Sequence, residues 1–479
     1  MNDCTIILLG ASGDLSKRKI IPALYHLIER GILKKFVVIG AAREQISAQQ
    51  ILQRSQEFIG TINTAIWQTL QESFFYHTLD FTKQDDYHTL HERVQEYEKK
   101  YNLSGNRIIY IATASQFFCT ITRSLAASKL AHRLNTDEKI WHRMVYEKPF
   151  GSDLASAQAI NTCIQESFFE HQIYRVDHFL SKELVSNIAL LRFTNIFFEP
   201  LWNNRYIENV QIILDESIGL EGRGAYYDKY GALSDVVQNH ILEMLALIAM
   251  ESPATLQADD LRNARAQLLT HVEFVDGILG QYEGYTQEPN VALDSKTETF
   301  AAVILNINND RWRSVPFYLR TGKKLYGKKT GIYITFKKVA CLLAKQCPTK
   351  PNFLTIQIDP APFFAIQVNA KKMGSFSEVN PINMEFCHNN IIPLAYETLL
   401  EAIYKADQSV AVRFDEIESA WKITDTIKAA HLKVYPYKQG EAGPAELEAL
   451  NNTYGIGDVH ETRTHRTGKN GKCNCPTSN

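Results

Sequence analysis

The sequence predicts a protein of class α/β plus α+β: a doubly wound parallel sheet at the N-terminus, followed by a larger domain built on a mostly antiparallel sheet. Three observations support this prediction. Short β-branched runs alternate with helical periods over the first 150 residues, strands with few interposed helices dominate from residue 209 onward, and a glycine turn directly follows the first predicted strand. Alternating strands and helices are typical of a parallel sheet covered by helices.

The N-terminal domain is expected to span residues 1–175. Its apolar, β-branched runs predict strands, and two stretches with a helical period predict helices between them. The predicted strands are residues 5–9, 36–40, 74–77, 107–112 and 144–147, and the predicted helices are residues 20–30 and 86–100. The 479 residues leave room for this domain and a larger one, because a domain typically takes roughly 100–200 residues.

The C-terminal domain is expected to span residues 176–461. Its strand-like runs lack the regular helical alternation of the first domain, which indicates a mostly antiparallel sheet. The predicted strands are residues 210–214, 300–307, 332–336 and 354–358. Residues 462–479, which include Cys473 and Cys475, contain Thr, Gly, Asn, Lys, Arg and Pro without an apolar period. This composition predicts a disordered tail.

The composition is that of an ordinary globular protein. Hydrophobic residues make up 45% of the chain and charged residues 22%, which excludes a disordered, collagenous or coiled-coil chain. The 51 Lys plus Arg nearly balance the 53 Asp plus Glu, so the formal charge is −2. Such a chain has no overall field that would attract nucleic acid or an anionic membrane. Local cations would have to bind any anionic ligand.

Export and membrane insertion are not expected. The longest apolar stretches, residues 241–250 among them, are interrupted by Glu243 and are shorter than the roughly 20 residues of a membrane helix. Asp3 stands where a secretory signal would carry positive charge, and the apolar run behind it ends at Leu9. Eight scattered cysteines do not form a disulfide framework. We therefore expect a soluble, cytoplasmic protein.

The glycine turn is the first candidate site. It consists of Gly10, Ala11, Ser12, Gly13, Asp14 and Leu15 and opens the first predicted helix. Amides at a helix N-terminus after such a turn can bind the phosphates of a dinucleotide, which suggests a Rossmann-like cofactor domain. The usual spelling is G-x-G-x-x-G, and only Gly10 and Gly13 match it. A tight strand-to-helix turn without a ligand therefore remains an alternative.

The residue after the second predicted strand indicates which dinucleotide would bind. An NAD-binding protein usually has an acidic residue there, which holds the ribose hydroxyls. This chain has Arg43 at that position. A guanidinium can hold the 2′-phosphate of NADP through two hydrogen bonds, whereas a carboxylate would repel it. Arg43 therefore favours NADP over NAD, and a solvated surface arginine is the alternative.

Three cations near the end of the first domain could bind a phosphate dianion. Lys148 follows a predicted strand, at the edge where ligands of open α/β sheets collect. His178 and Lys182 are four residues apart and would share one face if their segment were helical. The alternatives are an ordinary exposed lysine and a capped helix start with a solvated ion-pair face.

His240 is the candidate general base. On a helical wheel it falls between Val236 and Val237, toward the apolar side of a helix that begins near Asp235. A histidine in that position is commonly a hydrogen-bonded core residue. A half-buried imidazole beside a carboxylate is also the usual make-up of a general base. The residues alone leave both interpretations open.

The order of these motifs resembles that of glucose-6-phosphate dehydrogenases, from Cys4 to about Gly457. The motifs are Gly10 to Leu15, Glu147-Lys148-Pro149-Phe150-Gly151, Arg175-Val176-Asp177-His178, Gln238-Asn239-His240, Val315-Pro316-Phe317 through Arg320-Thr321-Gly322-Lys323, and Asp415-Glu416 through Trp421. The resemblance implies oxidation of glucose 6-phosphate to 6-phosphogluconolactone with hydride transfer to NADP, the first oxidative step of the pentose phosphate pathway.

The resemblance also implies roles for individual residues. Asp177 and His240 would form a catalytic dyad. The implied substrate-binding residues are Lys148, His178, Lys182, Glu216, Asp235, Lys323 and Lys328, with His178 and Lys182 on the phosphate. The implied cofactor-binding residues are Gly10, Ala11, Ser12, Gly13, Asp14, Leu15, Arg43 and Lys148. No metal is expected, because hydride transfer uses the cofactor's own chemistry, and the expected assembly is a homodimer or homotetramer.

The chain departs from the family pattern at several positions. Phe179 and Ser181 replace the usual Tyr and Gly, so a phenolic hydroxyl on the phosphate is missing. Ser234 stands where an arginine usually precedes the Asp, and Ala114-Ser115 replaces a common Pro pair near the nicotinamide. Two alternatives stay open: a redox-sensing NADP-binding protein, and a dehydrogenase of another sugar phosphate or of unphosphorylated sugar.

Overall fold

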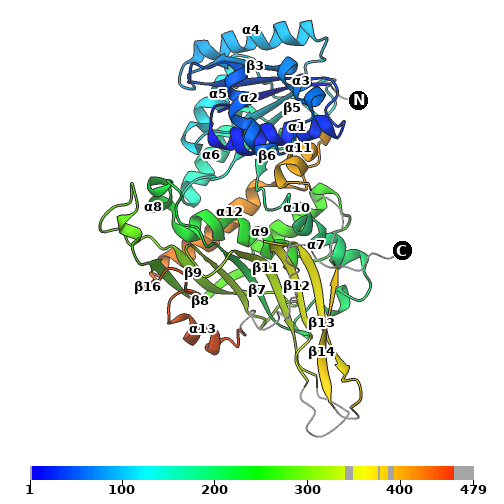
Figure 1. Ribbon diagram of the computed structural model, residues 1–479, viewed down its shortest axis with the longest axis vertical. Coiled ribbons are helices and arrows are strands. Elements are labelled where there is room, and N and C mark those ends of the chain that lie inside the picture. Colours follow the sequence, from blue (N-terminus) through cyan, green and yellow to red (C-terminus); the bar gives the residue numbers. More distant parts are fainter. Residues whose placement is uncertain (1–2, 340–348, 376–377, 387–392, 458–479) are drawn as a thin grey trace. The chain divides into compact units, whose positions relative to one another are not determined.

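The computed structural model describes residues 3–339, 349–375, 378–386 and 393–457 (Figure 1). The predicted tail at residues 462–479, with Cys473 and Cys475, lies outside these ranges. The chain divides into two compact units. The first comprises Met1–Lys182, Gln257–Arg262 and Pro393–Glu418, and the second comprises Glu183–Leu256, Asn263–Ile392 and Ser419–Asn479.

The division differs from the predicted boundary at residue 175, because the first unit takes in two later segments. Strand β15 (Ala411–Val412) pairs antiparallel with β6 (Ile173–Val176). Helix α11 (Ala395–Lys405) packs on α1 (Ile21–Glu29), and residues of both helices belong to one apolar core. Such long-range packing has no local signal in the sequence.

The first unit is built on a seven-stranded sheet in the order β15-β6-β5-β4-β1-β2-β3. All neighbouring strands are parallel except β15 and β6. The remaining strands are β1 (Cys4–Leu9), β2 (Phe36–Ala42), β3 (Phe74–Thr78), β4 (Arg107–Ile111) and β5 (His142–Glu147). Strand β1 lies between β2 and β4, so the strand order reverses there, and ligands of open α/β sheets bind at such a point. The five predicted strands and the parallel sheet are confirmed.

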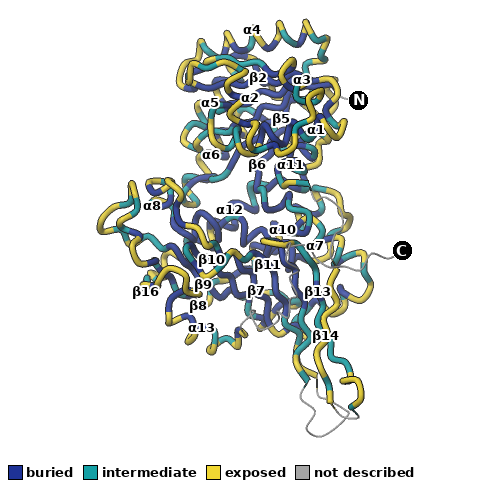
Figure 2. The backbone as a smooth tube through the Cα atoms, in the orientation of Figure 1, coloured by how far each residue is buried: buried dark blue, intermediate teal, exposed yellow. Residues whose placement is uncertain are grey.

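Helices connect these strands. They are α1, α2 (Ala48–Ser55), α3 (Thr64–Ser73), α4 (Gln84–Lys100), α5 (Phe118–Ala127) and α6 (Leu154–Ser167). Figure 2 shows the strands β2 and β5 buried and α4 exposed along most of its length. The apolar residues of α4 recur at helical spacing on one side, which is why one stripe of it is buried and the rest solvated. Both predicted helices, 20–30 and 86–100, are confirmed.

The second unit is built on a nine-stranded sheet in the order β14-β13-β12-β11-β7-β10-β9-β8-β16. Only β7 with β10 and β8 with β16 are parallel pairs, so the sheet is mostly antiparallel, as predicted. The strands are β7 (Ile207–Asp215), β8 (Val272–Tyr282), β9 (Phe300–Ile307), β10 (Phe317–Gly322), β11 (Lys329–Phe336), β12 (Phe353–Asp359), β13 (Phe363–Lys371), β14 (Val379–Phe386) and β16 (Val434–Tyr437).

This unit contains more helix than the sequence indicated. Four helical segments separate β7 from β8: α8 (Gly224–Ala232), the π-helical segment η6 (Leu233–Ile241), α9 (Leu242–Ala249) and α10 (Ala258–Leu269). The unit also contains α7 (Glu183–Thr194) and α13 (Leu447–Thr453), while α10 and α12 (Phe414–Ala429) each include residues of both units. All eight residues of α9 are buried, so this helix lacks the single apolar stripe by which a surface helix is recognised.

The stretch from α8 to α9 is apolar enough to be mistaken for a membrane span. Within the described residues, Gly224–Ala249 is the one helical stretch that could cross a membrane by length and composition. Its most apolar window is 94% buried inside the protein. A helix that is apolar all round fits the core of a large domain equally well, and this one is such a core helix.

Three side chains from elsewhere in the second unit complete the C-terminal end of α9. Arg192 donates from Nη1 to the carbonyl of Leu247 (3.2 Å), Trp202 donates from Nε1 to Ile248 (2.7 Å), and Trp312 donates from Nε1 to Ala249 (2.7 Å). The last carbonyls of a helix have no partner within the helix. These donors therefore satisfy groups that would otherwise be buried without a hydrogen bond.

Candidate active site

The glycine turn directly follows β1, at the point where the strand order reverses. Gly10 has φ +94°, and a Cβ there would lie 2.4 Å from the carbonyl oxygen of Ala112. The Gly13 amide donates to the Gly10 carbonyl (3.0 Å), and the Ser16 hydroxyl donates to the same oxygen (2.9 Å). Only glycine fits the first position. Gly13 and Asp14 are exposed, so the outer side of the turn is open to solvent.

Arg43 is the first residue after β2 and is exposed. Because β1 and β2 are parallel neighbours, the ends of both strands meet at one edge, and the Gly10 amide donates to the carbonyl of Ala41 (2.8 Å). Across the described ranges, no carboxylate lies within ion-pair distance of the Arg43 guanidinium. The turn and a guanidinium available for an anion thus share the carboxyl edge of the sheet.

Lys148 is the first residue after β5. The last residue of that strand, Glu147, is buried, and Lys148 after it is half-buried. The carboxylate of Glu147 accepts hydrogen bonds from Tyr110 and Tyr396. Glu147 was part of a sequence motif but no role was predicted for it, and no sequence pattern indicated Tyr396. The one signal available was a glutamate at the end of a strand that is otherwise apolar.

Asp177 follows β6 directly, and its side chain is only 3% exposed. Its Oδ1 accepts a hydrogen bond from the Phe179 amide (2.9 Å). The Leu180 amide donates to the carbonyl of Asp177, and the Lys182 amide to that of Phe179, both at 3.1 Å. These two consecutive turns fix the segment between strand and helix.

The condition under which His178 and Lys182 would share a helical face is therefore not met, because α7 begins only at Glu183. The turns arrange the cations differently. The Lys182 ammonium lies 4.2 Å from the centroid of the Phe179 ring, and the His178 ring lies 4.9 Å from the same ring. The His178 ring also stacks on Tyr396, with centroids 6.0 Å apart and planes at 19°. Both side chains thus contact aromatic rings, and they do not share a helical face.

Two predicted substrate residues meet in the second unit. Strands β7 and β10 are parallel, with Asp215 paired to Gly322, so Glu216 and Lys323 each follow a strand at the same edge. Lys323 Nζ lies 2.5 Å from Glu216 Oε2 and 5.0 Å from the centroid of the Tyr227 ring. The Lys323 side chain is buried, so this ammonium is desolvated and paired with a carboxylate.

Asp235 and His240 lie in the π-helical segment η6, with side chains 5% and 4% exposed. In a π-helix the hydrogen bonds join residues i and i+5, so two residues with this spacing are separated by about one turn. Asp235 and His240 have this spacing and therefore lie toward the same side of η6. On the helical wheel of a regular α-helix, Asp235 and His240 would fall on different sides. The Tyr226 hydroxyl donates to Asp235 Oδ1 (3.1 Å). Ser234, the departure from the family pattern, is buried in the same segment.

A glycine and a half-buried glutamate lie at the start of η6. Gly231 has φ +66°, and a Cβ there would lie 2.3 Å from Glu298 Oε1. That oxygen accepts a hydrogen bond from the Leu233 amide (3.0 Å). Burial raises the pKa of Glu298, and the amide hydrogen bonds oppose the rise. Gly231 and Glu298 therefore set where the π-helical segment begins.

Lys328 is placed apart from this group. It precedes β11, is 56% exposed, and its ammonium lies 3.6 Å from Asp359 Oδ1. Among the described residues, Lys328 forms this ion pair with Asp359 and no ion pair or hydrogen bond with Glu216, Asp235 or Lys323.

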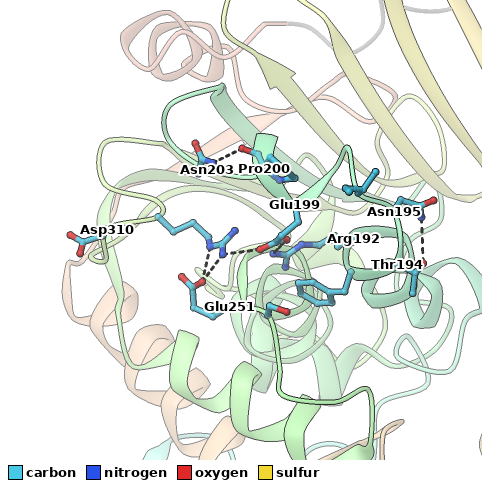
Figure 3. Close-up of a pocket in the computed structure, with 12 residues that line it drawn as sticks. Arg192, Thr194, Asn195, Glu199, Pro200, Asn203, Glu251 and Asp310 are labelled. Carbon is cyan, nitrogen blue, oxygen red and sulfur yellow. Dashed lines mark hydrogen bonds and ion pairs between the residues drawn. The ribbon is translucent and has the colours of Figure 1, made fainter.

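A cavity of about 800 Å³ lies elsewhere in the second unit, and none of the predicted site residues lines it (Figure 3). Glu199 accepts from both Arg192 (3.3 Å) and Arg311 (2.8 Å), and Arg311 also pairs with Glu251 (2.6 Å). Burial lowers the pKa of Arg192 to about 9, so its guanidinium stays charged at neutral pH. A positive charge is favourable at a helix C-terminus, and this network supports the end of α9.

Comparison with known proteins identifies the family. The model "Glucose-6-phosphate dehydrogenase, NAD binding domain" matches residues 7–187, and "Glucose-6-phosphate dehydrogenase, C-terminal domain" matches residues 189–458. The glucose-6-phosphate 1-dehydrogenase of Bacillus subtilis (strain 168) is 39% identical over 473 residues, which cover 93% of this chain and 96% of the relative. That of Chlamydia pneumoniae is 37% identical over 481 residues, covering 93% and 94%.

Solved structures agree with this assignment. A glucose-6-phosphate dehydrogenase in complex with its substrate glucose-6-phosphate has a TM-score of 0.87 at 31% identity, covering 95% of this chain and 98% of that one. The enzyme from Mycobacterium avium has a TM-score of 0.82 at 34% identity, covering 94% and 96%. The chain therefore belongs to the glucose-6-phosphate dehydrogenase family and is an oxidoreductase that acts on glucose 6-phosphate.

Proposed function

We propose that this dehydrogenase transfers the hydride to NADP in preference to NAD. The observation that carries the proposal is Arg43, an exposed guanidinium at the end of β2. In NAD-binding proteins a carboxylate at this point holds the ribose hydroxyls. A carboxylate would repel the additional phosphate of NADP, whereas an arginine binds it through charge-assisted hydrogen bonds.

The rest of the carboxyl edge fits a dinucleotide. Gly10 lets the backbone turn sharply, and Gly13 and Asp14 leave the outer side of the turn open. We assign the pyrophosphate to Gly10, Ala11, Ser12, Gly13, Asp14 and Leu15, the 2′-phosphate to Arg43, and a contact with the cofactor to Lys148. When bound, the nicotinamide supplies the hydride acceptor. The proposed reaction assigns no metal-binding role to these residues.

We assign proton abstraction to His240 and its orientation to Asp177. Oxidation of an anomeric carbon to a lactone removes the hydroxyl proton and a hydride from the same carbon, so a base must take the proton. An imidazole with restricted exposure suits that task, and a buried carboxylate beside it would stabilise the imidazolium. Both side chains are less than 5% exposed, at 4% and 3%. A well-placed general base contributes about 10²–10⁴-fold.

The substrate would be held by the remaining cations and carboxylates. We assign its phosphate to His178 and Lys182, and its sugar hydroxyls to Lys148, Glu216, Asp235 and Lys323. The buried Lys323 and the half-buried Glu216 with which it is paired offer a donor and an acceptor side by side, which suits a sugar hydroxyl. Lys328 is assigned a peripheral role, since it is exposed and paired with Asp359.

One assay tests the cofactor and the substrate together. The purified chain is given glucose 6-phosphate or unphosphorylated glucose, each with NADP or NAD, and reduced nicotinamide is followed by absorbance. We expect the highest kcat/KM with glucose 6-phosphate and NADP. Because Phe179 removes a hydroxyl from the phosphate side, the glucose arms are informative. Equal rates with both cofactors would contradict the role of Arg43, and equal rates with both sugars would contradict the phosphate site.

We also propose that the enzyme is a homodimer or a homotetramer in the cytoplasm. Strand β14 is an edge of its sheet and is exposed along most of its length (Figure 2). Its exposed large apolar residues are Ile382, Met384 and Phe386. An exposed apolar edge strand is a site for pairing with another chain. Relatives from Solanum tuberosum and Arabidopsis thaliana are named as cytoplasmic isoforms. Light scattering during gel filtration should give at least twice the mass of one chain, and Met384→Lys should lower it.

A further inference from the structure

The carboxylate of Glu147 is the most deeply buried acid in the first unit's candidate site that has no role in the mechanism above. It is the last residue of β5, and its side chain is 8% exposed. Its Oε1 accepts a hydrogen bond from Tyr110, at 2.5 Å, and one from Tyr396, at 3.2 Å. Tyr110 belongs to the neighbouring strand β4, whereas Tyr396 belongs to α11, which lies far along the chain.

Two proposed substrate residues depend on this carboxylate. Lys148 is the next residue in the chain, so the anchored Glu147 fixes the backbone from which Lys148 extends. The second link runs through Tyr396, whose ring stacks on His178 while its hydroxyl is bound to Glu147. Tyr396 is itself 9% exposed. Glu147 therefore links Lys148, through the backbone, with the ring that stacks on His178, through its carboxylate.

The charged and titratable groups that face Glu147 come from four elements. They are Tyr110 on β4, Lys148 after β5, Asp177 after β6 and Tyr396 on α11. Burial raises the pKa of Glu147 to about 7, Asp177 raises it further, and the two tyrosines and Lys148 oppose the rise. Near neutral pH the carboxyl therefore changes between a neutral and a charged form.

We propose that Glu147 is a positioning residue for glucose 6-phosphate, which holds Lys148 directly and His178 through Tyr396. The proposal rests on the assignment of His178 and Lys148 to the substrate. Hydrogen bonds to an ionised acceptor are shorter and stronger than those to a neutral one. The ionised carboxylate therefore holds Tyr396 firmly, and protonation loosens the ring against which His178 stacks. Substrate affinity should thus include a pH-dependent part that belongs to Glu147.

The test uses Glu147→Gln and Tyr396→Phe in the full chain. Glutamine keeps the size and an acceptor oxygen but cannot ionise, and phenylalanine keeps the ring but removes the hydroxyl. Tyr404→Phe is the matched control, because Tyr404 lies on the same helix and packs against the same apolar core as Tyr396, but its hydroxyl does not bind Glu147. Calorimetry measures the binding of glucose 6-phosphate alone at pH 8 and pH 6, and steady-state kinetics give kcat and both KM values.

At pH 8 we expect Glu147→Gln and Tyr396→Phe each to weaken glucose 6-phosphate binding about three- to tenfold, as expected for one lost or weakened hydrogen bond. The kcat and the Tyr404→Phe control should change less than about twofold, and the KM for NADP should rise less than the KM for glucose 6-phosphate. The double variant should lose no more than the stronger single variant, because both act through one contact. At pH 6, where the wild-type carboxyl is mostly neutral, the difference between wild type and Glu147→Gln should shrink.

Several results would overturn the proposal. Unchanged binding at pH 8 in both variants would exclude the link, and a loss of equal size at both pH values would exclude a role for the charge. Equal rises in both KM values together with a lower Tm would show a merely structural residue. Lys182→Ala separates this proposal from the assignment of the phosphate site. If Lys182→Ala binds substrate normally, the phosphate site is assigned wrongly. If Lys182→Ala weakens binding and the Glu147 and Tyr396 variants do not, the phosphate site stands and the positioning role of Glu147 is wrong.

Discussion

The two units present their candidate residues in different ways. In the first unit Gly10, Arg43, Lys148 and Asp177 each directly follow a strand, and the other candidates lie in the turns that continue from Gly10 and Asp177. In the second unit Glu216 and Lys323 obey the same rule, although most of the sheet is antiparallel, because β7 and β10 form a parallel pair. Asp235 and His240 do not, since they lie inside a buried helix. Residues at strand ends can be found from the sequence pattern, whereas residues inside a helix depend on its local geometry.

The largest expected effect tests whether the helix of the second unit carries the chemistry. His240→Asn keeps size and polarity but removes the base, so kcat should fall about 10²–10⁴-fold with substrate affinity largely kept. Asp177→Asn, at a strand end of the first unit, should lose a similar or smaller factor. The double variant should lose less than the product of the two effects, because the residues act as a unit.

Thermal stability is the control for this pair of variants. If His240→Asn loses activity only in proportion to the protein that unfolds, then His240 is a core residue. In that case the functional residues would all lie at strand ends, and the helix of the second unit would contribute none.

Arg43 tests the strand-end rule in the first unit. Arg43→Ala should weaken NADP binding about ten- to hundredfold, because it removes a charge-assisted contact worth roughly 1.5–3 kcal/mol. The affinity for NAD, which lacks the 2′-phosphate, should change little. Fluorescence titration with each cofactor gives both numbers, and equal losses would refute the assignment.

Lys182 tests whether the turns after β6 form a phosphate site. Lys182→Ala should raise the KM for glucose 6-phosphate by about tenfold through loss of a point charge on the dianion, and the KM for NADP should stay nearly constant. A similar rise for NADP would place Lys182 in the other site. The measurement is steady-state kinetics with each substrate varied in turn.

Phe179→Tyr is the companion change at the same turn. A phenolic hydroxyl that reaches the phosphate would improve binding by about 0.5–1.5 kcal/mol. Phe179 is 7% exposed and its ring centroid lies 4.2 Å from the Lys182 ammonium, so the added hydroxyl must find room in a buried environment. An unchanged KM would mean that the turn has been rebuilt around phenylalanine.

The last expected effect is on stability. The pKa of Glu147 is raised by burial from 4.5 to about 7, so the folded chain binds more protons than the unfolded chain between these values, and stability falls as pH rises through that window. Glu147→Gln removes this dependence. Its Tm relative to wild type should therefore rise between pH 5 and pH 8. If scanning calorimetry gives the same difference in Tm between Glu147→Gln and wild type at pH 5 and at pH 8, the pKa of Glu147 is not raised by burial.

The fold was predictable to the extent that local pattern determines it. Strands β1, β2 and β4 are buried throughout, so their β-branched runs leave no ambiguity, and Gly10 is required by its positive φ. The return of the chain through α11 and β15 was not predictable, because it depends on packing between residues far apart in sequence. The division into units at Lys182 rather than at residue 175 follows from the same packing.

The site was predictable in its residue types but not in its geometry. The π-helical turn that puts Asp235 and His240 on one side depends on Gly231 and on Glu298, which lies 65 residues after the Leu233 amide it accepts from. The aromatic contacts of His178 and Lys182 replaced the helical face expected from their spacing. Tyr396 could not be found at all, since its contacts with Glu147 and His178 span more than 200 residues of chain.

The end of α9 has a consequence for how the second unit comes apart. Its last carbonyls are bound by donors 55, 46 and 63 residues away in the sequence, on Arg192, Trp202 and Trp312. The end of the helix therefore cannot fray by itself, because each step would expose a guanidinium or an indole buried elsewhere. These segments should open as one cooperative block. In native-state hydrogen exchange, the indole N–H groups of Trp202 and Trp312 should exchange at the same free energy as the amides of α9.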